Sequence, residues 1–396
     1  MKRVIFLVDM NAFFIGCEMA RNQELKGKPA AVAGDPKDRS GIVLTANYEA
    51  RKYKVKTTMT IREARELCPE IIFVPPDHEY YSMMSRKVME VLGRYSPVIQ
   101  QNSIDEAWMD LTGCQSLFGE PGEIAKKIMN SIMNELDLWC SIGISENKFL
   151  AKMASEMKKP LGITEVLEKD VKEKIWPLPV RAMYGIGRQT EKKLLNLAIV
   201  KIGDIAGCDK SLLCKIFGKY GEELSRLSNG IDQTPVEENP QHDSKSISRS
   251  TTLQQDTTNL EYAKSIILKL AEEIGAEARG LKLKGKTVSI TIKYWDFKSI
   301  TRQKSVSFTS ATMDIYETGA KLLKENWDFN NPVRLLGIGL GDLKEDSIEQ
   351  LSLFESPVHN DKSEREEKID RAMDIIRNKF GSDKIKRAKS MQIKNR

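Results

Sequence analysis

The chain has 396 residues, 40% of them hydrophobic and 30% charged, which is the composition of a globular protein with roughly two to four domains. No apolar stretch approaches the roughly 20 residues of a membrane span and no secretory signal is visible, so we expect a cytoplasmic protein with no membrane partner. The six cysteines show no Cys-x-x-Cys spacing, which argues against a disulfide frame and a zinc site. The chain has only three histidines, which argues against imidazole chemistry and favours chemistry between carboxylates and Mg²⁺.

The net charge of +6 is unevenly distributed along the chain. Residues 242–310 and residues 361–396 each contain 12 Lys/Arg against 7 Asp/Glu, so the remainder is net negative. This distribution suits a C-terminal half that binds a polyanion and an N-terminal half that holds acidic metal ligands. A basic surface without any partner explains the charge alone equally well.

The first 165 residues alternate between strand-like and helix-like apolar patterns. The expected strands are 3–9, 41–45, 97–100, 107–111 and 139–144, and the expected helices are 12–20, 48–53, 61–67, 80–95, 122–136 and 147–157. When residues 11–76 are set aside, the order is β-α-β-β-α-β, which is the ferredoxin-like arrangement. In that arrangement strand 3–9 lies beside the hairpin centred on residue 105.

Two acidic positions stand at the ends of these strands. Asp9 closes the apolar run Val4–Val8, and Asp105-Glu106 lies between two strand-like segments. Carboxylates brought together on one sheet can hold two divalent cations about 3.5–4 Å apart for phosphoryl transfer. The alternative is a strand-end cap at Asp9 and an exposed acidic turn at 105–106.

Residues 168–232 are expected to form short helices joined by tight turns. The segment Tyr184–Gly187 followed by a leucine-rich helix resembles a helix-hairpin-helix, in which Gly185 and Gly187 let backbone N–H groups approach a phosphate closely. The polar stretch 233–243, which contains two prolines, is typical of a linker.

From residue 245 to 341 the β-α-β-β-α-β order returns. The expected strands are 245–252, 287–297, 300–308 and 333–340, and the expected helices are 260–278 and 312–327. Four basic residues lie along these strands, so the sheet can bind a nucleic-acid backbone; they are Lys245, Arg249, Lys293 and Arg302. After residue 342 the chain is highly charged, with a helix expected over 366–380; this tail can fold back on the preceding domain, touch DNA or be disordered.

Four segments carry a specific resemblance to a known family. Val4–Glu18, Gly41–Val55, Ser103–Asp110 and Asn147–Gly162 occur in the order seen in the Y-family translesion DNA polymerases, and they are most similar to the bacterial DNA polymerase IV type. The resemblance covers about residues 1–355. It implies template-directed addition of deoxynucleotides to a primer 3′-hydroxyl, with low fidelity and bypass of damaged template bases.

The resemblance also implies a fold class, an α+β multidomain right-hand polymerase. Its parts are a ferredoxin-like palm (1–10 and 77–166), small fingers (11–76), a helical helix-hairpin-helix thumb (167–232), a linker (233–242), a βαββαβ little finger that binds DNA (243–342) and a tail (343–396).

The resemblance assigns roles to individual residues. Asp9, Asp105 and Glu106, with the backbone carbonyl of Met10, match the residues that hold two Mg²⁺ ions. Tyr48, Arg51 and Lys159 match those that bind the nucleotide triphosphate. Phe13 and Phe14 lie beside the sugar, with Phe14 as the steric gate against a 2′-hydroxyl. The residues expected to contact DNA are Gly185, Gly187, Lys245, Arg249 and Arg302.

One departure and one further motif complete the comparison with the family. Asn11 stands where many relatives have a second aspartate. Residues 350–354, with Gln350, Leu353 and Phe354, resemble the peptide that docks on the sliding clamp (β clamp). The expected partners are therefore primer-template DNA, deoxynucleoside triphosphates and the clamp, and the protein is expected to act as a monomer.

Two other functions remain open at this point. A nucleotide cyclase can use the same palm with two metal ions, because fold does not fix function. The helix-hairpin-helix and the basic second sheet argue against it, since an enzyme acting on free nucleotide needs neither. A catalytically silent DNA-binding repair scaffold is the other alternative, and the intact acidic and basic site residues argue against it.

Overall fold

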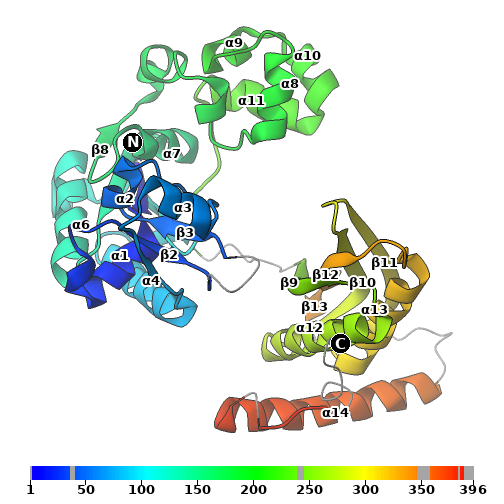
Figure 1. The fold of residues 1–396 in the computed structure, drawn as a ribbon. Coiled ribbons are helices and arrows are strands. Elements are labelled where there is room, and N and C mark those ends of the chain that lie inside the picture. The colour runs from blue at the N-terminus through cyan, green and yellow to red at the C-terminus, as the bar shows by residue number, and fades with distance from the viewer. Residues whose placement is uncertain (1, 36–40, 239–244, 346–356, 382–383, 388–396) are drawn as a thin grey trace. The chain divides into compact units, whose positions relative to one another are not determined.

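The structure is a computed structural model that describes residues 2–35, 41–238, 245–345, 357–381 and 384–387 (Figure 1). It divides into two compact units, which we call unit 1, with the described residues 2–35 and 41–238, and unit 2, with the described residues from 245 onward. The predicted clamp peptide, residues 350–354, lies outside the described residues. Within the described part of the chain, no helix is long and apolar enough to cross a membrane.

Unit 1 is built around a five-stranded sheet whose order is β5-β6-β1-β7-β8. Its strands are β1 (Ile5–Met10), β5 (Val98–Gln101), β6 (Glu106–Asp110), β7 (Cys140–Ser145) and β8 (Ile163–Glu165). β1 is central and pairs antiparallel with both β6 and β7. The predicted ferredoxin-like arrangement is therefore confirmed, with β8 as an additional strand parallel to β7.

Helices cover both faces of this sheet. Phe6 and Val8 of β1 pack in one core with residues of α4 (His78–Gly93) and α6 (Pro121–Leu136). Ile5 and Leu7 face the other way and pack with Trp108 and with Ala151 of α7 (Lys148–Met157). Because side chains alternate along a strand, Asp9 has the same orientation as Leu7 and faces α7.

The remainder of unit 1 consists of a small sheet and a helical region. The sheet has the order β3-β2-β4, with β2 (Ala30–Ala33), β3 (Val43–Ala46) and β4 (Ile72–Val74). The helices next to it are α1 (Phe13–Arg21), α2 (Tyr48–Lys52) and α3 (Ile61–Leu67). The helical region holds α8 (Arg188–Leu195), α9 (Ile202–Gly207), α10 (Lys210–Phe217) and α11 (Lys219–Ser228).

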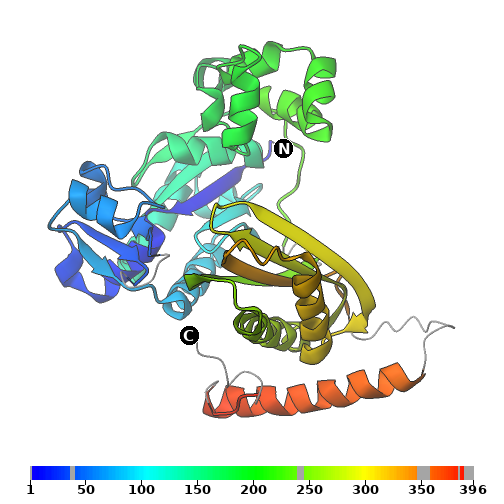
Figure 2. The same cartoon turned by 45° about the vertical axis from the view of Figure 1, so that its right-hand side comes forward.

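Unit 2 is a four-stranded antiparallel sheet with the order β11-β10-β12-β9, and two helices cover one of its faces (Figure 2). Its elements are β9 (Ser246–Thr257), α12 (Leu260–Gly280), β10 (Leu283–Tyr294), β11 (Ser299–Thr309), α13 (Thr312–Asn326) and β12 (Val333–Gly341), and the two-residue β13 (Lys344–Glu345) pairs with β10. The core between sheet and helices includes Ile247, Ile290 and Ile338. The predicted second β-α-β-β-α-β order is confirmed.

The tail forms a helix that packs on unit 2. α14 (Pro357–Phe380) contacts α12 and α13 and lies on their side away from the sheet (Figures 1 and 2). The buried Arg279 side chain of α12 ion-pairs with Asp370 at 3.1 Å and Asp374 at 2.7 Å. Of the three alternatives left open by the sequence, the structure therefore has the tail helix folded back on the preceding domain.

Candidate active site

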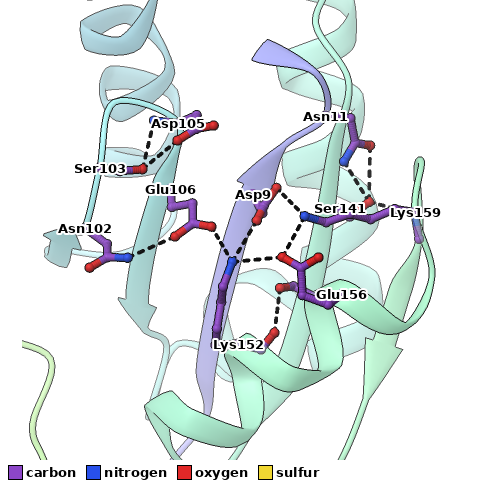
Figure 3. Close-up of polar contacts among 12 residues, drawn as sticks. Asp9, Asn11, Asn102, Ser103, Asp105, Glu106, Ser141, Lys152, Glu156 and Lys159 are labelled. Atoms are coloured by element: carbon purple, nitrogen blue, oxygen red, sulfur yellow. Dashed lines mark hydrogen bonds and ion pairs between the residues drawn. The ribbon is translucent and has the colours of Figure 1, made fainter. Parts of the chain in front are cut away.

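The two acidic positions predicted from the sequence meet at the end of β1. Asp9 and Glu106 are direct partners in the register of β1 and β6, and the Met10 N–H donates to the Asp105 carbonyl at 2.9 Å. Asp9 is only 5% exposed. The strand pairing itself therefore places the Asp9 and Glu106 side chains next to each other on the face that α7 covers (Figure 3).

Two lysines from α7 and the turn after it approach these carboxylates. Lys152 Nζ lies 3.0 Å from Asp9 Oδ2 and 2.9 Å from Glu156 Oε1, and it also bonds Glu106. Lys159 Nζ lies 2.7 Å from Asp9 Oδ1 and 2.8 Å from Glu156 Oε1. Asp9 is thus held between two ammonium groups, and Glu156 is their shared partner (Figure 3).

The carboxylates form a group that suits a divalent cation. Oxygen atoms of Asp9, Glu106 and Glu156 all lie within 4.8 Å of one another. Asp105 lines the same cavity, but its carboxylate accepts a hydrogen bond from the Ser103 hydroxyl at 2.6 Å. Carboxylate oxygens are the ligands that hard cations such as Mg²⁺ prefer, and they outnumber the two lysine charges here. The donor set therefore fits a divalent metal ion.

The electrostatics of the group follow from burial and from the lysines. Burial raises the pKa of the Asp9 carboxyl, as does its neighbour Glu106, while Lys159 and Lys152 oppose the rise. Burial also acts to raise the pKa of Glu106, but hydrogen bonds with Asp9 and Lys152 hold it below its ordinary value. The carboxylates raise the pKa of Lys152 and of Lys159 despite burial, so both lysines stay cationic at neutral pH.

A cavity of about 300 Å³ opens beside the carboxylates. Tyr48 and Arg51 line it together with Asp9, Met10 and Lys159. The Asn47 side chain caps α2 by accepting from the Ala50 N–H at 3.0 Å, and the helix that begins there puts Tyr48 and Arg51 on one face. The Arg51 guanidinium lies 4.8 Å from the centre of the Tyr48 ring. The structure thus brings three predicted triphosphate residues, Tyr48, Arg51 and Lys159, to one cavity.

The two adjacent phenylalanines have different surroundings. Phe13 is buried and lines the cavity. Phe14 is half-buried and stacks on Tyr81, with ring centres 4.5 Å apart and planes 15° from parallel. The structure therefore places Phe13, but not Phe14, among the residues that line the cavity, and the stack on Tyr81 fixes the plane of the Phe14 ring.

The helix-free face of the unit 2 sheet is rich in small polar residues. Val288 and Ile290 of β10 enter the core under the helices, so Ser289 faces the opposite way. A Cβ placed on Gly339 would lie 2.9 Å from Ser289 Oγ and 3.2 Å from Ser248 Cβ, which shows that the three residues share that face. By the same alternation and register the face also carries Ser250, Thr287, Thr291, Thr301, Gln303, Ser305, Gly337 and Gly341.

The predicted DNA-binding arginines lie on the other side of this sheet. Arg249 pairs in register with the buried Ile338, and its guanidinium bonds Glu277 of α12. Arg302 of the edge strand β11 donates to Asn326 Oδ1 of α13 at 3.2 Å. Both cationic groups are therefore directed toward the helices at the sheet edges, whereas Lys245 is exposed at the start of β9.

The glycines of the predicted helix-hairpin-helix lie at the start of α8. Gly185 has φ 91°, a conformation that favours glycine, and its carbonyl accepts from the Tyr220 hydroxyl at 2.9 Å. Gly187 is the N-cap residue of α8, and both glycines are exposed. The first N–H groups of α8 are thus available to an anion.

Lys152 and Glu156 are site residues that the sequence-based prediction missed. They lie four residues apart on α7, and Lys159 follows Glu156 by three. That spacing places charged residues on one helix face, and it is visible in the sequence within the segment Asn147–Gly162. The spacing alone does not show that this face packs against Asp9, because the contact depends on how α7 crosses the sheet.

Comparison with known proteins gives a consistent result. The impB/mucB/samB family model matches residues 8–156, the model of the family's C-terminal domain matches 244–353, and the model of its HHH motif matches 168–198. The chain is 53% identical to the DNA polymerase IV of Clostridium kluyveri and 52% identical to that of Alkaliphilus oremlandii, over 98% of this chain in each case and 98% and 99% of the relatives. A solved Y-family DNA polymerase chimera, Dbh-Dpo4(243-245)-Dbh, superposes with a TM-score of 0.76 and 28% identity, over 86% of this chain and 99% of the chimera.

Proposed function

Because the chain belongs to the impB/mucB/samB family of Y-family DNA polymerases, we propose that Asp9, Asp105 and Glu106, with the Met10 carbonyl, are the metal ligands of a DNA polymerase site that uses two Mg²⁺ ions. The protein is a template-directed translesion DNA polymerase, so primer-template DNA and deoxynucleoside triphosphates are its substrates, and its chemistry uses divalent metal ions. The observation that carries the proposal is the register pairing of Asp9 with Glu106 beside a cavity lined by cationic residues.

The site residues divide the work of nucleotidyl transfer among them. When bound, the metal ions lower the pKa of the primer 3′-hydroxyl and offset the charge of the triphosphate. Asp9 and Glu106 supply oxygen ligands from neighbouring strands, so the distance between them is fixed by the sheet. Lys152 bonds both carboxylates and limits their mutual repulsion. Asp105 contributes its carboxylate from the hairpin that carries Glu106.

The triphosphate is bound by residues from two sides of the cavity. Arg51 and Tyr48 approach from α2, and Lys159 approaches from the turn after α7. Cations and hydroxyls at the phosphate oxygens stabilise the charge that develops as pyrophosphate leaves. Phe13 lines the cavity beside the sugar, and Phe14, fixed against Tyr81, is the steric gate that excludes a 2′-hydroxyl.

DNA binds to the remaining parts of the chain through its backbone. The hydroxyl and glycine face of the unit 2 sheet lets a phosphate backbone approach the strands closely, and Lys245 adds positive charge at its edge. Gly185 and Gly187 present the first N–H groups of α8 to a phosphate. Arg249 and Arg302 bind DNA only from the sheet edges, because their guanidinium groups contact the helices.

The finer organisation of the protein follows the family. The palm comprises 1–10 and 77–166, the fingers 11–76, the thumb 167–232, the linker 233–242, the little finger 243–342 and the tail 343–396. Gln350, Leu353 and Phe354 dock on the sliding clamp, which raises the local concentration of the polymerase at the primer end. The enzyme acts as a monomer in the cytoplasm.

One assay separates this function from its alternatives. The protein is incubated with Mg²⁺, the four deoxynucleoside triphosphates and a primer annealed to a template that carries an abasic site. The proposal expects primers extended to and beyond the lesion. Conversion of free triphosphate to a cyclic nucleotide without a primer would indicate a cyclase, and binding of the duplex without any extension would indicate a scaffold.

A further inference from the structure

Asn11 lies at the junction of three segments in unit 1. It follows β1 directly, is 6% exposed, and its backbone N–H donates to the Trp139 carbonyl at 2.7 Å. Its side chain points from the end of β1 toward β7 and the turn that leads to β8 (Figure 3). A buried amide of this kind needs partners for both its oxygen and its nitrogen.

The partners of the Asn11 side chain belong to a single turn and the strand beside it. Asn11 Oδ1 accepts from the Leu161 N–H at 2.9 Å, and the fully buried Ser141 hydroxyl lies 3.1 Å from both Oδ1 and Nδ2. Ser141 Oγ in turn accepts from the Gly162 N–H at 3.3 Å. Asn11 and Ser141 together therefore receive two consecutive backbone donors of the turn.

The turn needs such support because its conformation is unfavourable for its sequence. Leu161 has φ 57°, in the left-handed region that residues with a side chain seldom adopt. Glycine at 162 suits the close approach to the Lys158 carbonyl, since a Cβ there would lie 1.9 Å from the carbonyl oxygen, so the unfavourable conformation in this turn is that of Leu161. Hydrogen bonds from fixed side chains are what hold a backbone in such a conformation.

This turn carries Lys159, two residues before Leu161. The Lys159 side chain extends from the turn into the cavity, where its Nζ contacts Asp9 and Glu156. A shift of the backbone at residues 160–162 moves the base of that side chain directly. The distance between an ammonium group and a triphosphate oxygen decides how strongly they attract each other.

We propose that Asn11 is a positioning residue for the incoming nucleotide, acting through the Leu161 N–H to hold Lys159 where it meets the triphosphate. The inference rests on the triphosphate-binding role of Lys159 in the proposed function. Asn11 also lines the nucleotide cavity. Its side-chain oxygen and nitrogen bond Leu161 and Ser141, so we expect it to act through the turn and not by contact with the nucleotide. An aspartate at this position keeps the acceptor for Leu161 and the contact with Ser141, so the geometry tolerates either residue, but asparagine adds no further negative charge beside Asp9.

The test uses steady-state single-nucleotide extension by the full-length protein. Asn11→Ala removes the acceptor, and it is expected to raise the KM for the nucleotide about tenfold while kcat changes much less, as expected when binding alone is weakened. Asn11→Asp keeps the acceptor and raises KM less than Asn11→Ala. Ser141→Ala removes the partner of Asn11 and the acceptor of the Gly162 N–H, so it is also expected to raise KM. It replaces Asn11→Ala in the test if that variant is too unstable to assay.

A double-mutant cycle tells whether Asn11 acts through Lys159. Lys159→Ala alone raises KM, and adding Asn11→Ala or Ser141→Ala to it produces no further rise beyond about twofold, because the shared target is already absent. A purely structural role for Asn11 predicts instead a lower melting temperature with KM unchanged. DNA affinity, measured by fluorescence anisotropy, stays constant in all variants.

Three results overturn the inference. The first is an unchanged KM in both Asn11→Ala and Ser141→Ala. The second is a rise in KM that multiplies with that of Lys159→Ala, since Asn11 then acts independently. The third is an unchanged KM in Lys159→Ala, which removes the triphosphate role of that lysine. Primer extension by the unmodified protein separates this third case from failure of the polymerase function itself.

Discussion

The two sheets of this protein share one order of elements and differ in strand pairing. In unit 1 the first strand, β1, is central and is flanked by β6 and β7. In unit 2 the first strand, β9, lies at the edge and, among the strands that the structure describes, pairs only with β12. A central first strand meets the hairpin between the second and third strands, so residues far apart in the sequence, such as Asp9 and Glu106, become neighbours.

The two sheets also differ in which faces are covered and in which residues lie on them. The unit 1 sheet is covered on both faces, and the proposed site residues gather at one strand end, where burial strengthens every charge interaction. The unit 2 sheet is covered on one face only, and the helix-free face carries hydroxyls and glycines. Strand pairing thus gathers buried charged residues at one strand end in unit 1 and spreads small polar residues over a broad face in unit 2.

The largest effect is expected at the strand end of unit 1. Glu106→Gln removes a carboxylate that pairs with Asp9, so we expect primer extension to fall by at least about 10³-fold, since charge stabilisation in a buried site dominates such reactions. DNA affinity, measured by anisotropy, should change little. The matched control is Glu135→Gln, which loses only an exposed ion pair with Arg94 and should retain full activity. An equal loss of primer extension in the two variants would contradict a specific role for Glu106.

A smaller effect is expected at the sugar. Phe14→Ala removes the ring that stacks on Tyr81, so the ratio of ribonucleotide to deoxynucleotide incorporation should rise about 10- to 100-fold, the range that shape selection by an apolar pocket supplies. Single-nucleotide extension with matched sugars measures this ratio. Phe14→Tyr keeps the ring and should keep the discrimination. If this ratio rose in Phe13→Ala but not in Phe14→Ala, Phe13 and not Phe14 would be the steric gate.

The smallest effect is expected on the unit 2 sheet, because the proposed DNA-binding surface is spread over many residues. Ser289→Asp puts a negative charge on the helix-free face, and we expect DNA affinity at low salt to fall about threefold to tenfold by repulsion of phosphates. The rate of extension at saturating DNA should not change. Thr258→Asp adds the same charge before α12, outside that face, and serves as the control. Equal affinities for the two variants would contradict a DNA-binding role for the helix-free face.

Much of the fold could be predicted because long periodic segments decide it. The helix predicted over 61–67 matches α3, and those predicted over 80–95 and 147–157 correspond to α4 and α7 within a few residues. The three-residue strands β4 and β8 were not predicted, since segments of that length have no measurable periodicity and exist only through their partners. The four-residue β2 was missed for the same reason.

The candidate site was predicted less completely than the fold. Asp9 and Glu106 were identifiable because each carboxylate follows or opens an apolar strand. Glu156 and Lys152 were missed because their role depends on α7 crossing the same face of the sheet, which local sequence does not specify. The Arg249 side chain points toward Glu277 because α12 covers that face of the sheet. The basic residues along the strands therefore predicted which sheet is basic, but not the face to which each side chain belongs.

The most direct test of the account is a crystal structure of the full chain with primer-template DNA, a non-hydrolysable deoxynucleoside triphosphate and Mn²⁺, in which anomalous scattering locates the metal ions. We expect anomalous peaks within coordination distance of Asp9, Asp105 and Glu106, with the triphosphate contacting Arg51 and Lys159. Peaks that bind only the triphosphate or other residues, with Asp9 free of metal, would contradict it.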